Sequence, residues 1–166
     1  MTPWRSGISV GALLLGAIVM QTTVFGRINV GGIAPDVVML VVILLPLRLR
    51  AETTLLLAFS SGLVLDSLGS AALGLRAFTL TVVAFIAVRT RERADYSPLA
   101  AAVWVLILTL VGVLLLVTVG TLVSQLPFGG VEALRRILLV PLLTFGVALA
   151  VWPVLARLIE PVRRSL

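Results

Sequence analysis

The sequence predicts an all-α membrane protein with six transmembrane helices, and three observations lead to this fold class. Apolar residues make up 60% of the 166 residues, while charged residues make up only 12%, about half the usual share in a soluble domain. The apolar runs are continuous instead of alternating, which favours helices over a β-barrel. Backbone polar groups find no water in a bilayer, so each helix must satisfy them internally.

Six apolar segments approach the length of about 20 residues that a helix needs to cross a bilayer. We expect helices over residues 6–25, 34–48, 51–69, 73–89, 98–123 and 133–158. The second is the shortest. Its continuous apolar run weakens at Pro46, and Pro35 suits the first turn of the helix. The connections are brief, which favours antiparallel hairpins, so residues 1–166 are predicted to form a single integral membrane domain.

The N-terminal segment has one feature of a signal peptide, because Arg5 precedes its apolar run. The run is long, however, and no cleavage site of small residues follows it. We therefore expect a retained first helix.

The arginines, which are all 13 of the basic residues, decide the predicted orientation, because cytoplasmic loops are enriched in Lys and Arg. With the N-terminus inside, the inner side collects Arg5, Arg48, Arg50, Arg89, Arg91, Arg93, Arg157, Arg163 and Arg164. The outer side collects only Arg27, Arg76, Arg135 and Arg136. Both termini are therefore predicted to be cytoplasmic. The net charge of +6 is assigned to the inner loops, so no nucleic-acid partner is expected.

The residues that are missing exclude several functions. The chain contains no Cys and no His, which removes thiol nucleophiles, disulfides, histidine metal sites and the usual general base. There is also no Lys-containing phosphate loop and no signature of an ion-selective filter. We expect no enzymatic activity, no cofactor and no metal site.

Charges within the apolar segments need a reason, because a charge at the bilayer centre costs about 3 kcal/mol. Asp36 lies in the first turn of the second predicted helix, where the helix dipole favours an anion. Asp66 lies near the end of the third, where the dipole disfavours it. Arg76, one hairpin away, is the nearest candidate partner, and we predict that the two side chains form an ion pair.

These charges all fall on the predicted outer side. Arg135 and Arg136 begin the sixth helix there, and Glu132 is four residues before Arg136, so those two side chains can pair along the helix. The outer third of the bundle is thus expected to hold a polar cluster. A surface for a partner, a shallow ligand cavity and a structural network that satisfies itself remain open alternatives.

Small residues recur at helical spacing and predict close approach between helices. The first helix contains Gly7, Gly11, Ala12 and Gly16, while Ala58, Gly62, Asp66 and Gly69 share one face of the third. Most such faces serve packing within one chain. The spacing in the first helix also leaves a homodimer open.

The sequence resembles the MreD family of bacterial rod shape-determining proteins. The resemblance rests on Ala34-Pro35-Asp36, on Gly62-x-x-x-Asp66-x-x-Gly69 and on Gly74-Leu75-Arg76-Ala77. It implies a non-enzymatic scaffold of the peptidoglycan elongation machinery in the bacterial inner membrane. It also implies a partnership with MreC and, through MreC, with MreB, RodA and a class B penicillin-binding protein.

The resemblance further implies a helical arrangement similar to the substrate-binding subunits of energy-coupling-factor transporters. A vitamin-binding transporter subunit is therefore the alternative function. It would need polar and aromatic side chains around a cavity. Trp4 and Trp152 are expected at the membrane interface, which leaves only Trp104 as a buried candidate.

Overall fold

The computed structural model describes residues 3–23, 33–69, 73–92, 98–123 and 131–159. They form six α-helices and one short 3-10 helix, and no strand occurs among them. The elements are α1 (Pro3–Thr23), α2 (Val37–Leu44), η1 (Leu45–Leu47), α3 (Ala51–Leu68), α4 (Leu75–Thr90), α5 (Pro98–Leu122) and α6 (Val131–Ile159). The predicted all-α class is confirmed. Every α-helix except α2 begins and ends within three residues of the expected positions.

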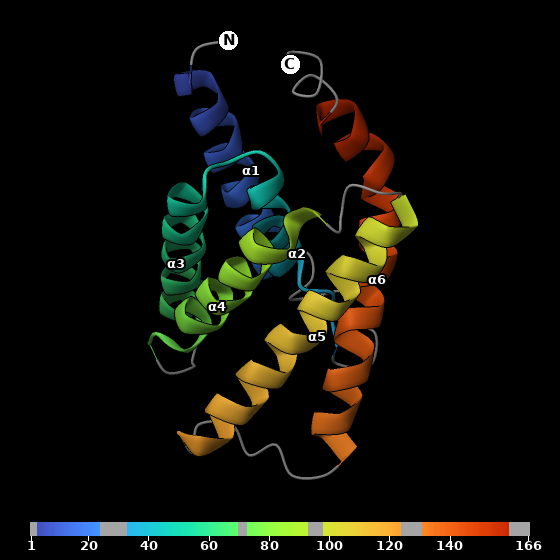
Figure 1. Cartoon of the computed structure of the whole chain (residues 1–166). Coiled ribbons are helices and arrows are strands. Elements are labelled where there is room, and N and C mark those ends of the chain that lie inside the picture. The colour runs from blue at the N-terminus through green and yellow to red at the C-terminus, as the bar shows by residue number, and fades with distance from the viewer. Residues whose placement is uncertain (1–2, 24–32, 70–72, 93–97, 124–130, 160–166) are drawn as a thin grey trace.

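Successive helices alternate in direction, so that α1 begins and α6 ends at the same end of the molecule (Figure 1). Helices α3 and α4 pack as one hairpin, α5 and α6 pack as another, and α4 joins the two by packing against α5. We call the end where α2, α4 and α6 begin the capped end. The opposite end, where α3 begins and α4 ends, is the arginine end.

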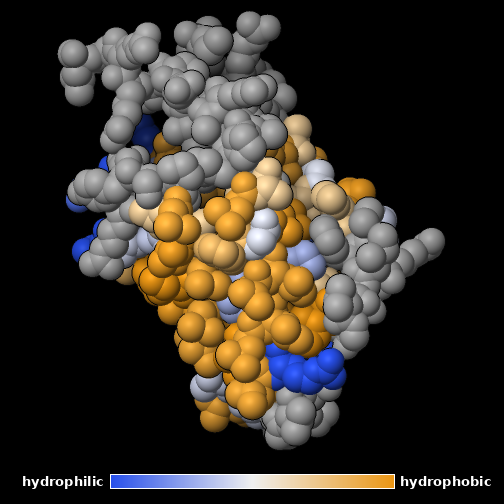
Figure 2. Space-filling view, turned by 90° about the vertical axis from the view of Figure 1, so that its right-hand side faces the viewer, coloured by the Kyte–Doolittle hydropathy of each residue, from blue (hydrophilic) through white to orange (hydrophobic). Residues whose placement is uncertain are grey.

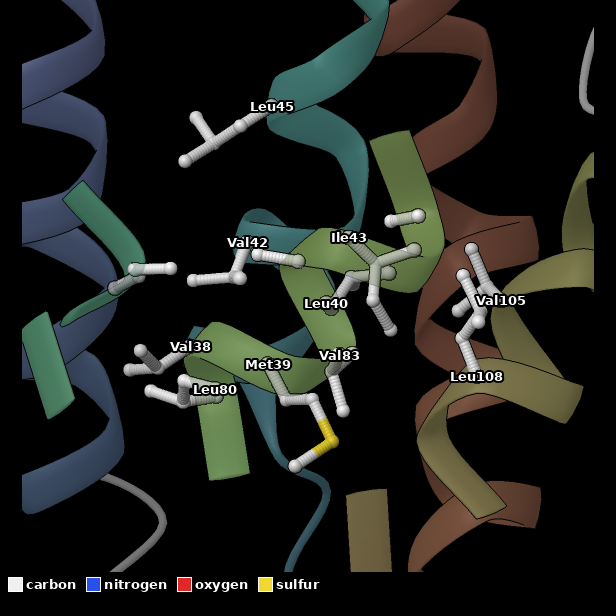
Figure 3. Packing of buried hydrophobic residues seen from close by; sticks show 14 of the residues in the cluster. Val38, Met39, Leu40, Val42, Ile43, Leu45, Leu80, Val83, Val105 and Leu108 are labelled. Atoms are coloured by element: carbon white, nitrogen blue, oxygen red, sulfur yellow. The ribbon is translucent and has the colours of Figure 1, made fainter. Parts of the chain in front are cut away.

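Helix α2 forms the centre of the core, because it contacts all five other α-helices. Its side chains Val38, Met39, Leu40, Val42 and Ile43 are buried. Figure 3 shows them packed with Leu80 and Val83 of α4 and beside Val105 and Leu108 of α5. Helix α2 is hydrophobic on every face, and these faces pack against other helices of the protein instead of against lipid.

The helical segment within the predicted range 34–48 is shorter than expected and changes from α-helix to 3-10 helix before its end. Helix α2 has eight residues, about 12 Å at 1.5 Å per residue, which is well short of a bilayer core of about 30 Å. Pro46 explains its end, because proline cannot donate the next backbone hydrogen bond, and the chain continues as η1. Pro35 is not in the first turn either, since it precedes the N-cap residue Asp36.

Three stretches within the described helices are long and apolar enough to cross a membrane: Ala51–Leu68, Leu99–Leu122 and Ala133–Ala150. The side of the molecule turned toward the viewer in Figure 2 is mainly apolar, with strongly hydrophilic residues at its margins. Helix α6 contributes a stripe of exposed leucines at helical spacing: Leu134, Leu138, Leu142 and Leu149. Such an outer surface suits lipid contact.

Candidate functional site

Asp66 has a different partner from the one its sequence position suggested. Its side chain is 2% exposed, and its carboxylate accepts hydrogen bonds from three backbone N–H groups at the start of α4. The donors are Gly74 at 2.9 Å, Arg76 at 3.1 Å and Ala77 at 3.2 Å. The first N–H groups of a helix have no partner within that helix. Asp66 therefore caps α4 from the neighbouring helix α3.

The predicted ion pair between Asp66 and Arg76 is wrong. Arg76 donates its backbone N–H, and no ion pair joins the carboxylate to the Arg76 guanidinium within the residues that the structure describes. The carboxylate does need a positive partner near the end of α3, and the N-terminal dipole of α4 supplies it.

Gly62 lies one helical turn before Asp66 and faces the same first turn of α4. A Cβ atom at this position would overlap the Cα and backbone N of Ala77, and the carbonyl carbon of Arg76 would be only 2.9 Å away. The two helices can approach this closely because Gly62 has no side chain. This approach brings the α4 backbone to the Asp66 carboxylate, so Gly62 and Asp66 act together.

Two further glycines shape the same hairpin. Gly74 is the N-cap residue of α4 with a φ of +98°, which lies in the left-handed region that glycine enters most easily. Gly69 ends α3, and its backbone N–H donates to the carbonyl of Leu65 at 3.0 Å. The Gly62-x-x-x-Asp66-x-x-Gly69 and Gly74-Leu75-Arg76 segments therefore form one structural unit.

Asp36 caps α2 in the usual way, with its side chain accepting from the Met39 N–H at 2.9 Å. Its own backbone N–H donates to the Thr144 hydroxyl of α6 at 3.1 Å, and the next N–H, that of Val37, donates to the Gln21 side chain of α1 at 2.8 Å. The start of the central helix is thus tied to α1 and α6 as well as capped.

The two capped helix starts meet at a small recess. Asp36 and Arg76 both line it, together with Met39, Leu65, Thr79, Leu80 and Leu116. Its volume of about 10 Å³ leaves room for about one water molecule. Binding sites for drug-sized molecules occupy about 300 Å³ or more, so this recess cannot hold a vitamin.

The other predicted site residues do not join this recess. Arg135 is exposed and Arg136 is partly buried near the start of α6, and neither lines the recess. The Glu132 side chain and Arg27 lie outside the described residues, so the pairing of Glu132 with Arg136 stays a prediction. Of the polar cluster expected on the outer side, Asp36, Asp66 and Arg76 lie close to the recess, while Arg135 and Arg136 do not line it.

Several structural residues are not marked by the charges and small residues that stand out in the sequence. Gln21 and Thr144, which bind the start of α2, are uncharged polar residues inside apolar helices, and that pattern often marks interhelical hydrogen bonds. Gly112 of α5 makes room for Met39, whose sulfur would lie 2.7 Å from a Cβ at that position. Trp104 is buried as expected, and its indole N–H donates to the Thr90 hydroxyl at 2.9 Å.

Two glycines of α1 lack the close contact with a neighbouring helix that Gly62 makes. A Cβ atom at Gly11 or Gly16 would meet nothing within 4 Å in the described part of the chain. The close helix packing expected from glycine is therefore found at Gly62 in α3. It is not found at these two positions of α1.

A family model described as rod shape-determining protein MreD matches residues 4–161. The matched region covers both capped helix starts and nearly the whole chain. No curated protein and no solved structure matches the chain significantly.

Proposed function

The chain belongs to the MreD family of rod shape-determining membrane proteins, and from this premise we propose that it is a non-enzymatic scaffold of the peptidoglycan elongation machinery, acting with MreC. The family match over residues 4–161 carries the proposal. MreC is its direct partner, and MreB, RodA and a class B penicillin-binding protein are reached through that assembly.

The chemistry of the capped end supports a structural role. The carboxylates of Asp36 and Asp66 both accept hydrogen bonds from backbone N–H groups, which commits them to holding helices in place. The recess that Asp36 and Arg76 line has room for about one water molecule. No observation favours the alternative of a vitamin transporter subunit, and the likeness to energy-coupling-factor subunits stays a prediction.

Association with MreC is the test of the partnership. We expect MreC to be retained with the affinity-tagged chain when both are captured from mild-detergent extracts of bacterial membranes. An unrelated single-span membrane protein, expressed at the same level, is the control for non-specific capture. Ser67→Ala should retain MreC, because Ser67 is exposed and its hydroxyl bonds only to the Val64 carbonyl of its own helix. Absence of MreC beside a folded, captured chain would contradict the partnership.

We also propose that the chain lies in the inner membrane with its arginine end and both termini in the cytoplasm. Exposed arginines support this orientation, because Arg48, Arg50, Arg89 and Arg91 all lie at the arginine end and cytoplasmic segments are enriched in such residues. Because α1 begins and α6 ends at that same end (Figure 1), both termini follow it.

The orientation can be tested with single cysteines, since the chain has none of its own. Arg135→Cys places a thiol at the capped end and Arg91→Cys places one at the arginine end, both at exposed positions. In cells with a permeable outer membrane and an intact inner membrane, a thiol reagent that cannot cross membranes should label Arg135→Cys only. Lysed cells, in which both variants should react, provide the control. Labelling of Arg91→Cys in intact cells would reverse the proposed orientation.

A further inference from the structure

Four exposed arginines lie at the arginine end of the molecule. Arg48 and Arg50 follow η1, while Arg89 and Arg91 lie at the end of α4, and all four side chains are exposed. The segment η1 contacts α4, and the start of α3 and the end of α4 lie at the same end of the molecule (Figure 1). We call these four residues the arginine cluster.

The local backbone turns the first pair outward. Leu47 and Leu49 pack against the buried core, while the alternating residues Arg48 and Arg50 are exposed. The inward leucines therefore hold the connection in place and leave both guanidinium groups on its outer side.

The four arginines outnumber the two exposed acids, Glu52 and Glu92, that lie near them in the described part of the chain. None of the four arginines forms an ion pair there. The contact that the structure does show is a stacking one, with the Arg89 guanidinium 5.1 Å from the centre of the Phe85 ring. A cation–π contact orients the guanidinium and leaves its positive charge in place.

Phe85 belongs to an exposed aromatic face of α4. Phe78 and Phe85 are seven residues apart on one face of α4 and are 51% and 48% exposed. An exposed aromatic stripe on a membrane helix faces the acyl chains. Arg89 lies one turn beyond Phe85, the arrangement expected of a long basic side chain that extends from the acyl chains toward the lipid headgroups.

We propose that the arginine cluster binds the phosphate headgroup of an anionic membrane lipid. Guanidinium groups bind phosphate oxygens in a bidentate manner, and basic residues beside a membrane helix attract anionic lipids. The stacking of Arg89 on a lipid-facing ring favours a lipid over a soluble acidic peptide, because that ring is reached from the bilayer. The site goes beyond the scaffold function and does not depend on it.

The test is native mass spectrometry of the purified full chain in detergent, titrated with phosphatidylglycerol or with phosphatidylcholine. The chain should bind phosphatidylglycerol more tightly than phosphatidylcholine. Arg89→Gln should weaken phosphatidylglycerol binding about fivefold, as expected for one basic residue near a membrane surface. Arg89→Lys, which keeps the charge, should lose less. The matched control is Arg135→Gln, which removes an exposed arginine at the opposite end and should leave binding unchanged.

Replacement of all four cluster arginines by glutamine should remove the preference for phosphatidylglycerol. If this variant keeps the full preference while its circular dichroism shows an intact helix content, the proposal is wrong. Equal losses in Arg89→Gln and Arg135→Gln would also overturn it, because binding would then follow net charge alone. A hexaglutamate peptide that binds the cluster in phosphatidylcholine nanodiscs, and that phosphatidylglycerol does not displace, would assign the cluster to an acidic protein segment instead.

Discussion

Replacing Asp66 with alanine should lower the free energy of unfolding by about 3 kcal/mol. The substitution removes the acceptor for the backbone N–H groups of Gly74, Arg76 and Ala77. Loss of a helix cap costs about 1 kcal/mol, and each buried donor left without a partner adds about 1–3 kcal/mol. Partial relaxation of the hairpin keeps the total below the sum. Equilibrium unfolding in detergent, followed by circular dichroism, measures the change.

Ser67→Ala is the matched control on the same turn of α3. Ser67 is exposed and donates only to the carbonyl of Val64, so its loss should change stability by less than about 0.5 kcal/mol. Asp66→Asn should lie between the two, because the amide keeps one acceptor oxygen. If Asp66→Ala were no more destabilising than Ser67→Ala, the capping role would be wrong.

The same series separates backbone capping from an ion pair. Because Asp66 binds the Arg76 backbone, Arg76→Ala keeps the hydrogen bond and should couple to Asp66→Ala by less than about 0.5 kcal/mol in a double-mutant cycle. A coupling energy well above this value would restore the ion pair that the sequence suggested.

Gly62→Ala should destabilise the α3–α4 hairpin by about 2–3 kcal/mol, in the range of overpacked cores. The added methyl group would overlap backbone atoms of Ala77, which cannot move aside as a flexible side chain could. We expect α3 and α4 to separate and the hydrogen bonds to Asp66 to lengthen. The measurement is again the unfolding free energy in detergent, together with hydrogen exchange at the backbone amides of the first turn of α4, which should become faster.

Gly16→Ala provides the control for the same chemical change. A Cβ at Gly16 has no neighbour within 4 Å in the described part of the chain, and alanine favours a helix over glycine by up to about 1 kcal/mol. This variant should be neutral or more stable. Equal effects of the two substitutions would mean that helix propensity, and not the approach of α4 to Gly62, sets the result.

The helices themselves could be predicted from the sequence, and so could most of the residues at the capped end. Asp36, Gly62, Asp66 and Gly74 all stand out in the sequence, because charges and glycines are conspicuous in an apolar chain. Their contacts were predicted less well. Arg76 is the nearest residue of opposite charge to Asp66 in the sequence, which is why its side chain is the predicted partner. The actual partner of Asp66 is the backbone of the following helix, and backbone N–H groups occur in nearly every residue, so the sequence does not mark them.

The all-α class and the bounds of five helices follow from the sequence alone, because continuous hydrophobicity and the need to satisfy the backbone leave little alternative in a bilayer. The short length and central place of α2, which contacts all the other α-helices, are properties of the tertiary structure. It also decided that Asp66 binds the start of α4. Both outcomes depend on which helices lie side by side. Close packing at positions such as Gly62 sets these neighbours, and the local pattern of hydrophobicity does not show which helices will pack together.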